Sequence, residues 1–129
     1  MAEDAGLVLD TPALTAYSRG LPLVGEQIAD MADRSQRVLV PALCLAIAYR
    51  DAASEAWPMI DILVDLPHVQ VSPMEGDMCA VMGGWSRTVS MDLAQAMIES
   101  ATHATVPILT DRRKQITTIL AKEWPIIDL

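Results

Sequence analysis

The apolar segments of this chain are short and unbroken, and amphipathic helical segments separate them. Leu7–Leu9, Val38–Val40 and Val106–Leu109 lack the alternation of apolar and polar residues that is typical of a sheet with one face in water. Each segment therefore predicts a strand that is buried on both faces, which is typical of parallel sheets covered by helices. We expect an α/β fold with three layers, in which a central parallel sheet lies between two layers of helices (α/β/α).

Periodicity and capping signals place the helices between these strands. Ser72, Pro73 and Glu75 resemble an N-cap, a first helical proline and a capping-box glutamate, and Gly83-Gly84 is expected to end that helix. The chain has no repeat, low-complexity tract or linker, so its 129 residues are expected to form a single domain. The expected helices cover residues 13–17, 22–34, 42–53, 57–66, 72–84, 90–103 and 111–122. A minor strand or an extended link is expected at 69–71, and a final strand is expected at 125–127.

The composition indicates a soluble protein. Apolar residues make up 52% of the chain, but the longest apolar run, Val38–Tyr49, falls short of the roughly 20 residues of a membrane span. The start "MAEDAG" has no basic-then-apolar signal, so a cytoplasmic protein is expected.

Cys44 and Cys79 lack the spacing of a zinc site, and both are expected to be buried thiols. The net charge of −8 argues against non-specific duplex binding, although metal ions can still bring an acidic site and phosphates together.

Three acids are expected near the carboxyl edge of the sheet. Asp10 and Asp111 each follow a predicted strand directly, and Asp92 lies in the first turn of a predicted helix. Ligands of open parallel sheets bind in the crevice at this edge, and clustered carboxylates attract Mg²⁺ or Mn²⁺. Two of the acids have a structural alternative: Asp92 suits a helix start, and Asp111 can cap the helix that follows it. Asp10 is harder to explain in this way, because before Thr-Pro it would cap only a short helix.

Several motifs together resemble the PIN-domain family, and in particular its small bacterial members, which include the toxins of Vap-type toxin–antitoxin pairs. They are "LVLDTPALTAY", "VLVPALCLAIAYR", "SMDLAQAMIESA", "VPILTDRR" and "WPIIDL", and they extend over nearly the whole chain. The resemblance implies the same three-layer fold and a Mg²⁺- or Mn²⁺-dependent ribonuclease that hydrolyses phosphodiester bonds. It implies Asp10, Asp92 and Asp111 as catalytic metal ligands, with the Thr11 and Thr110 hydroxyls supporting the acids or their waters.

The chain departs from the family pattern at two positions. Ile47 stands where the family normally has a glutamate, and Pro12 follows Asp-Thr where a small or hydroxyl residue is usual. Asp51 and Glu99 are too distant along their helices to be convincing substitutes. Because Mg²⁺ often uses only one or two carboxylates, one ion is expected rather than two, and an empty site is the alternative.

Three readings of function remain open. The first is a ribonuclease of toxin–antitoxin type whose activity is weakened or lost through Ile47. The second is a catalytically silent PIN-like module that binds a small antitoxin-like protein or its own copy. The resemblance favours a homodimer, because small bacterial PIN domains commonly form homodimers. The third is a structural α/β domain with scattered surface acids.

Two further patterns bear on partners. Arg112, Arg113 and Lys114 could contact an RNA backbone, or form a solvated charge run at a helix start. Methionines at 74, 78 and 82 are expected to form one core-facing helix stripe, although such a stripe also suits a partner groove.

Overall fold

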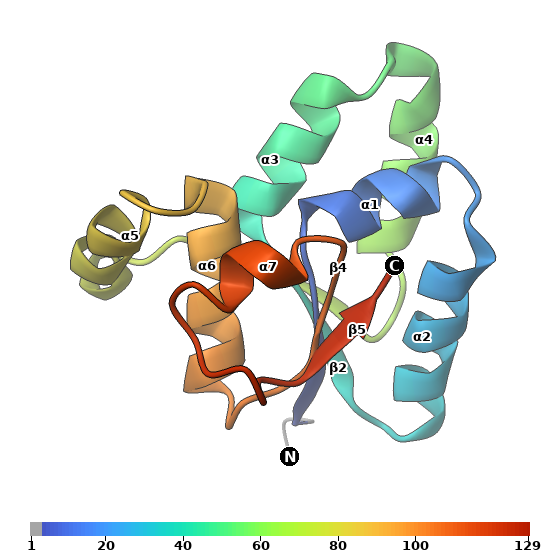
Figure 1. Ribbon diagram of the computed structural model, residues 1–129. Helices are drawn as coiled ribbons and strands as arrows, with labels where there is room; N and C mark the ends of the chain where they lie inside the picture. Colours follow the sequence, from blue (N-terminus) through green and yellow to red (C-terminus); the bar gives the residue numbers. More distant parts are fainter. Residues whose placement is uncertain (1–3) are drawn as a thin grey trace.

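The computed structural model describes residues 4–129 and contains one parallel sheet of five strands in the order β3-β2-β1-β4-β5 (Figure 1). All neighbouring strands pair in parallel, and β1 and β2 are buried along most of their length. This arrangement confirms the three-layer α/β/α fold with a central parallel sheet. The strands are β1 (Ala5–Leu9), β2 (Arg37–Pro41), β3 (Val69–Ser72), β4 (Ile108–Thr110) and β5 (Ile126–Asp128).

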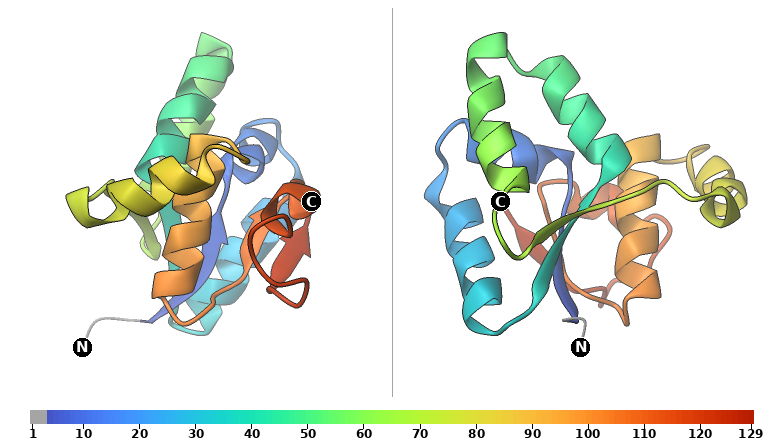
Figure 2. Two further views of the ribbon diagram at one scale, coloured as in Figure 1. Left: turned by 60° about the vertical axis from the view of Figure 1, so that its left-hand side comes forward. Right: turned by 180° about the vertical axis from the view of Figure 1, so that it is seen from behind.

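Helices cover both faces of this sheet (Figures 1 and 2). Helices α1 to α4 connect β1, β2 and β3, whereas α5 and α6 lead back across the sheet to β4. Because parallel crossovers are right-handed, this reversal of direction places α6 on the face opposite α1 and α2. The helices are α1 (Thr11–Ser18), α2 (Pro22–Asp33), α3 (Ala42–Asp51), α4 (Trp57–Val64), α5 (Cys79–Trp85), α6 (Met91–Thr102) and α7 (Arg113–Ile116), with short 3-10 turns η1 (Ser54–Ala56) and η2 (Gly76–Met78).

The strand order creates a switch point between β1 and β4. The chain leaves β1 toward β2 on one side, and it enters β4 from the helices of the opposite face. At such a point the two connections separate and leave a crevice outside the carboxyl ends of the strands. The residues that follow β1 and β4 therefore face each other across this crevice.

The predicted helix at 72–84 is wrong in its first half. Ser72 is the last residue of β3 and pairs with Pro41 of β2, so its backbone is extended and does not cap a helix. Regular helix begins only at Cys79, after η2, and it includes Gly83 and Gly84. The pairing with β2 overrides the local capping signal.

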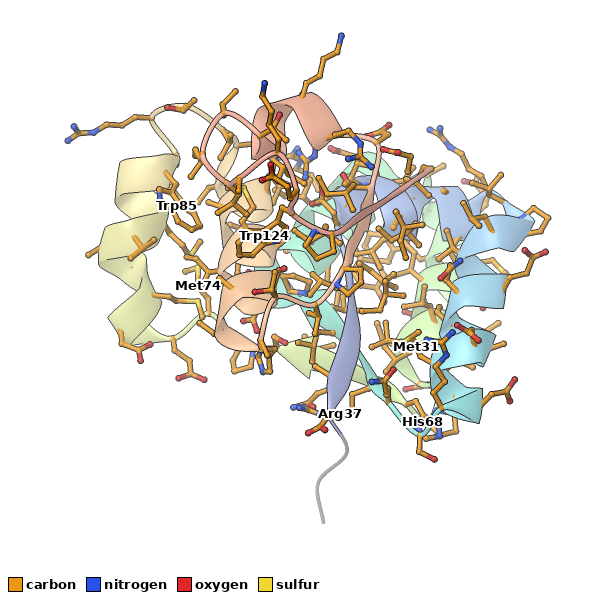
Figure 3. All side chains as sticks on the ribbon, turned by 60° about the horizontal axis from the view of Figure 1, so that its bottom comes forward. Met31, Arg37, His68, Met74, Trp85 and Trp124 are labelled. Carbon is orange, nitrogen blue, oxygen red and sulfur yellow. The ribbon has the colours of Figure 1, made fainter. Side chains whose placement is uncertain are left out.

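The predicted helix at 111–122 is also too long, because α7 ends at Ile116. The hydroxyl of Thr117 donates to the carbonyl of Arg113 at 3.2 Å, and that of Thr118 donates to the carbonyl of Gln115 at 2.6 Å. Such local bonds compete with the helical ladder and favour turns. The chain then turns toward Trp124, whose indole N–H donates to Ser100 of α6 at 2.8 Å (Figure 3).

Two expectations about sulfur-containing side chains need correction. Cys44 is buried as predicted, but Cys79 is exposed, because α5 projects from the body of the domain (Figure 2). The methionines do not form one helix stripe. Met74 lies outside helix and strand and is 51% exposed (Figure 3), and Met78 ends η2. Of the three methionines in the predicted stripe, Met82 alone belongs to the buried core.

Two further expectations concern the first residues of the chain and the absence of a membrane-spanning segment. Met1 to Glu3, which belong to the start "MAEDAG" on which the prediction of a cytoplasmic protein rests, lie outside the described residues. Among the helices of residues 4–129, none has the length and apolar character needed to cross a bilayer.

Candidate functional site

A cleft of about 650 Å³ opens at the carboxyl edge of the sheet, at the switch point between β1 and β4. Its walls come from α1, the C-terminal half of α3, the first turn of α6 and the segment after β4. The cleft thus collects residues that are far apart in the sequence. Its lining includes Thr11, Arg19, Ile47, Arg50, Asp51, Ser90, Asp92, Asp111 and Arg112.

Asp10 lies at the base of this site and is fully buried. It is the N-cap of α1, and one carboxylate oxygen accepts the N–H of Thr11 at 2.8 Å. The other oxygen accepts the hydroxyl of Thr110 at 2.8 Å, across the pair of strands β1 and β4. A carboxylate in this position is held rigidly by both strands that flank the crevice.

Asp92 reaches the same place from the opposite layer of helices. It lies in the first turn of α6 and is 4% exposed. The hydroxyl of Thr11 donates to its Oδ2 at 2.5 Å, so Thr11 links the two acids through its backbone and its side chain. Two of the three predicted acids therefore converge, and both predicted threonine hydroxyls donate to acids.

Arg112 occupies the space between these two carboxylates. Its Nε donates to Oδ2 of Asp10 at 2.9 Å, and its Nη2 donates both to Oδ1 of Asp10 and, at 3.0 Å, to Oδ2 of Asp92. Its Nη1 donates to the Ser90 hydroxyl at 2.9 Å, and its backbone N–H donates to the Thr110 hydroxyl at 3.0 Å. The guanidinium is thus the counterion of the acidic pair.

Arg112 had two predicted alternatives, an RNA contact or a solvated charge. In the structure its side chain is only 19% exposed and is engaged by the acids. Arg113 instead forms a surface ion pair with Asp128 at 2.8 Å, and Lys114 is exposed.

Asp111 is exposed at the rim of the cleft, while the next residue in the chain reaches inward. The group of potential metal ligands within residues 4–129 consists of Asp10, Cys44 and Asp92, whose ligand atoms lie within 4.8 Å of one another. Asp111 is not part of that group. The predicted trio of acids is therefore a buried pair with a third acid at the edge.

Cys44 completes the floor of the site from α3. Its thiol donates to the backbone carbonyl of Asp92 at 3.2 Å and lies 3.5 Å from Oδ1 of Asp10. Burial, reinforced by the charges of both acids, raises the pKa of this thiol well above its usual range. Cys44 therefore remains protonated and acts as a hydrogen-bond donor.

The electrostatics of the ion pair favour the charged forms. Burial alone would raise the pKa of Asp92, but hydrogen bonds from Thr11, Ser90 and Arg112 outweigh it and lower that pKa. Burial likewise opposes the charge of Arg112, yet its bonds to Asp10 and Asp92 raise the pKa of the guanidinium overall. Arg112 and Asp92 are both charged at neutral pH.

The two acids considered as substitutes for a residue-47 glutamate stay apart from the pair. Asp51 lines the cleft mouth, where Arg50 binds it at 2.8 Å. Glu99 lies further along α6, buried beside His103 at 3.7 Å and away from the cleft. Ile47 itself contributes an apolar wall.

The site fits a divalent ion only if the guanidinium moves. Asp10, Asp92 and the Thr11 hydroxyl are the hard oxygen donors that Mg²⁺ and Mn²⁺ prefer. As the side chains stand, however, every buried side-chain nitrogen and oxygen in the described part of the chain has a hydrogen-bond partner. The oxygen atoms that would bind the ion therefore already accept hydrogen bonds.

Sequence reasoning missed Cys44 and the inward position of Arg112. The cysteine was predicted to be buried, but nothing in the sequence indicated that it meets the acids. For Arg112, its place directly after a strand-end acid was the available signal. No protein-family model matches the chain, and no curated protein matches it.

Proposed function

We propose that this chain is a PIN-like domain of toxin–antitoxin type whose Mg²⁺- or Mn²⁺-dependent ribonuclease activity is weak or lost. One observation supports this above all: Asp10 and Asp92 converge at the carboxyl edge of a parallel sheet, each bonded by Thr11. In open α/β sheets that edge is where ligands bind. The proposed substrate class is RNA.

The residues also indicate why activity would be low. An ion held by Asp10 and Asp92 would neutralise phosphate charge and activate a water for in-line attack. Ile47 offers no carboxylate to orient that water or to hold a second ion. Asp111 and Asp51 line the cleft, but neither belongs to the buried group of Asp10, Cys44 and Asp92, so one ion is proposed rather than two.

The test is an RNA cleavage assay at high protein concentration with Mn²⁺, using the wild type and Asp10→Asn. Metal-dependent cleavage that Asp10→Asn abolishes would support an active nuclease. Asp128→Asn is the matched control, because Asp128 also pairs with an arginine but lies on the surface. If the wild type, Asp10→Asn and the control cleave RNA at equal and measurable rates, the proposed active site is wrong.

A second candidate function is a silent module that works through protein binding. Exposed apolar side chains on α4 and beside or on α5 favour it, namely Trp57, Ile62, Met74 and Val81, which are 44% to 51% exposed. The proposed partner is a second copy of the chain or a small antitoxin-like protein. Size-exclusion chromatography with light scattering tests the homodimer, and Ile62→Lys should dissociate a dimer that uses α4. A monomeric wild type would exclude self-association.

A further inference from the structure

We propose that Arg112 is an internal cation that competes with a divalent metal ion for the Asp10–Asp92 site. The inference rests on the proposed metal-dependent function and adds a regulatory residue to it. Under this proposal the domain has a closed state, in which the guanidinium neutralises the acids, and a metal-binding state, in which it has moved away.

The first support is position. The Nη2 atom of Arg112 donates to both Asp10 and Asp92, and ligand atoms of these acids lie within 4.8 Å of each other. An ion that bridges the two carboxylates would have to occupy the same volume as this nitrogen. Guanidinium and metal ion therefore exclude each other sterically as well as by like charge.

The second support is the charge of the site. Two buried carboxylates carry a charge of −2, and Arg112 already compensates half of it. A carboxylate at position 47 would add a further negative charge to the cleft and increase the attraction for a doubly charged ion. With Ile47 in its place, one guanidinium leaves the site with a net charge of only −1.

The third support is that the arginine is anchored beyond the acids. The Ser90 hydroxyl accepts from Nη1, and the Thr110 hydroxyl accepts from the backbone N–H. These contacts orient the guanidinium in the cleft before any ligand arrives. Because the side chain is 19% exposed and lines the cleft, it can leave toward solvent without opening the core.

The test is calorimetric titration of Mn²⁺ into the wild type and Arg112→Gln, supported by the Mn²⁺-dependent shift of the unfolding midpoint. Glutamine removes the charge and keeps hydrogen-bonding capacity, so Mn²⁺ should bind at least about tenfold more tightly than to the wild type. Arg113→Gln is the matched control and should leave the affinity unchanged, because Arg113 pairs with Asp128. Adding Asp10→Asn to Arg112→Gln should abolish the gained binding.

The outcomes separate this inference from the proposed function. If wild type and folded Arg112→Gln bind Mn²⁺ equally tightly, Arg112 is no competitor, while a metal-dependent nuclease stands. If neither binds Mn²⁺, both fail. If Arg112→Gln gains Mn²⁺ binding but cleaves no RNA, the competition stands and the nuclease function fails.

A milder variant covers the case in which Arg112→Gln does not fold. Ser90→Ala removes one anchor of the guanidinium together with a hydrogen bond to Asp92, and it keeps both carboxylates in the site. It should tighten Mn²⁺ binding in the same direction by a smaller factor. Unchanged affinity in Ser90→Ala would then overturn the proposal.

Discussion

Neutralising Asp10 should destabilise the protein, and the sign of this effect is informative. An acidic pair without a counterion is electrostatically strained: at 4.8 Å and an effective dielectric near 20, two carboxylates repel by about 3 kcal/mol. Removing one charge from such a pair stabilises the fold. Here Arg112 bonds both oxygens of Asp10, so Asp10→Asn removes an attraction instead.

The magnitude follows from what Asp10→Asn leaves behind. Breaking a buried ion pair by removing one partner costs about 3–5 kcal/mol. Asparagine still accepts some hydrogen bonds, and Arg112 keeps Asp92 as a partner at 3.0 Å. We therefore expect a loss of about 2–3 kcal/mol, which for a domain of this size lowers Tm by about 8–12 °C.

The assay is chemical and thermal unfolding in metal-free buffer that contains a chelator. Asp128→Asn is the control, because Asp128 also binds an arginine through two hydrogen bonds, at 2.8 and 2.9 Å, but on the surface. Solvent screening should make its effect small. An Asp10→Asn variant as stable as the wild type, or more stable, would refute the view that Arg112 neutralises this site.

Three further predictions concern single side chains. In the native protein one thiol per chain, Cys79, should react rapidly with Ellman's reagent. Cys44 should react only on unfolding, because burial raises its pKa. Two rapidly reacting thiols would contradict the buried position of Cys44. Burial raises the pKa of Glu99, partly opposed by His103, so stability should fall as pH rises above the ordinary value of 4.5. Urea unfolding at a series of pH values above 4.5 should show no such fall in the Glu99→Gln variant. A free energy of unfolding with the same pH dependence in the variant and the wild type would refute this prediction. Ile47→Glu should tighten Mn²⁺ binding in calorimetry, whereas Ala46→Glu, on the exposed side of α3, should not; equal effects would indicate non-specific attraction.

The fold could be predicted from the sequence because several local signals agree. Strands such as Leu7–Leu9 and Val38–Val40 are short, apolar and separated by helices, a pattern that few arrangements other than a covered parallel sheet satisfy. Errors arose where tertiary contacts compete with local signals. Ser72 has the sequence of a helix cap, but pairing with Pro41 keeps it in a strand.

The site was predictable in its backbone and less so in its side chains. Asp10 and Asp92 follow from strand-end and helix-start positions, which the strand order brings together. Asp111 and Arg112 are adjacent residues after β4, and the local backbone decides which of their side chains reaches into the cleft. The backbone of Arg112 is not that of a strand (φ −109°, ψ 37°). Sequence patterns do not resolve which of two adjacent side chains reaches inward.

Crystals grown with MnCl₂ would show whether the Asp10–Asp92 pair is a cation site that Arg112 fills. Anomalous difference maps would be compared for the wild type and Arg112→Gln. We expect the guanidinium between the carboxylates of the wild type and a manganese peak at that position in the variant. A manganese peak between the carboxylates of the wild type with Arg112 still bonded to both, or no peak there in the variant, would contradict it.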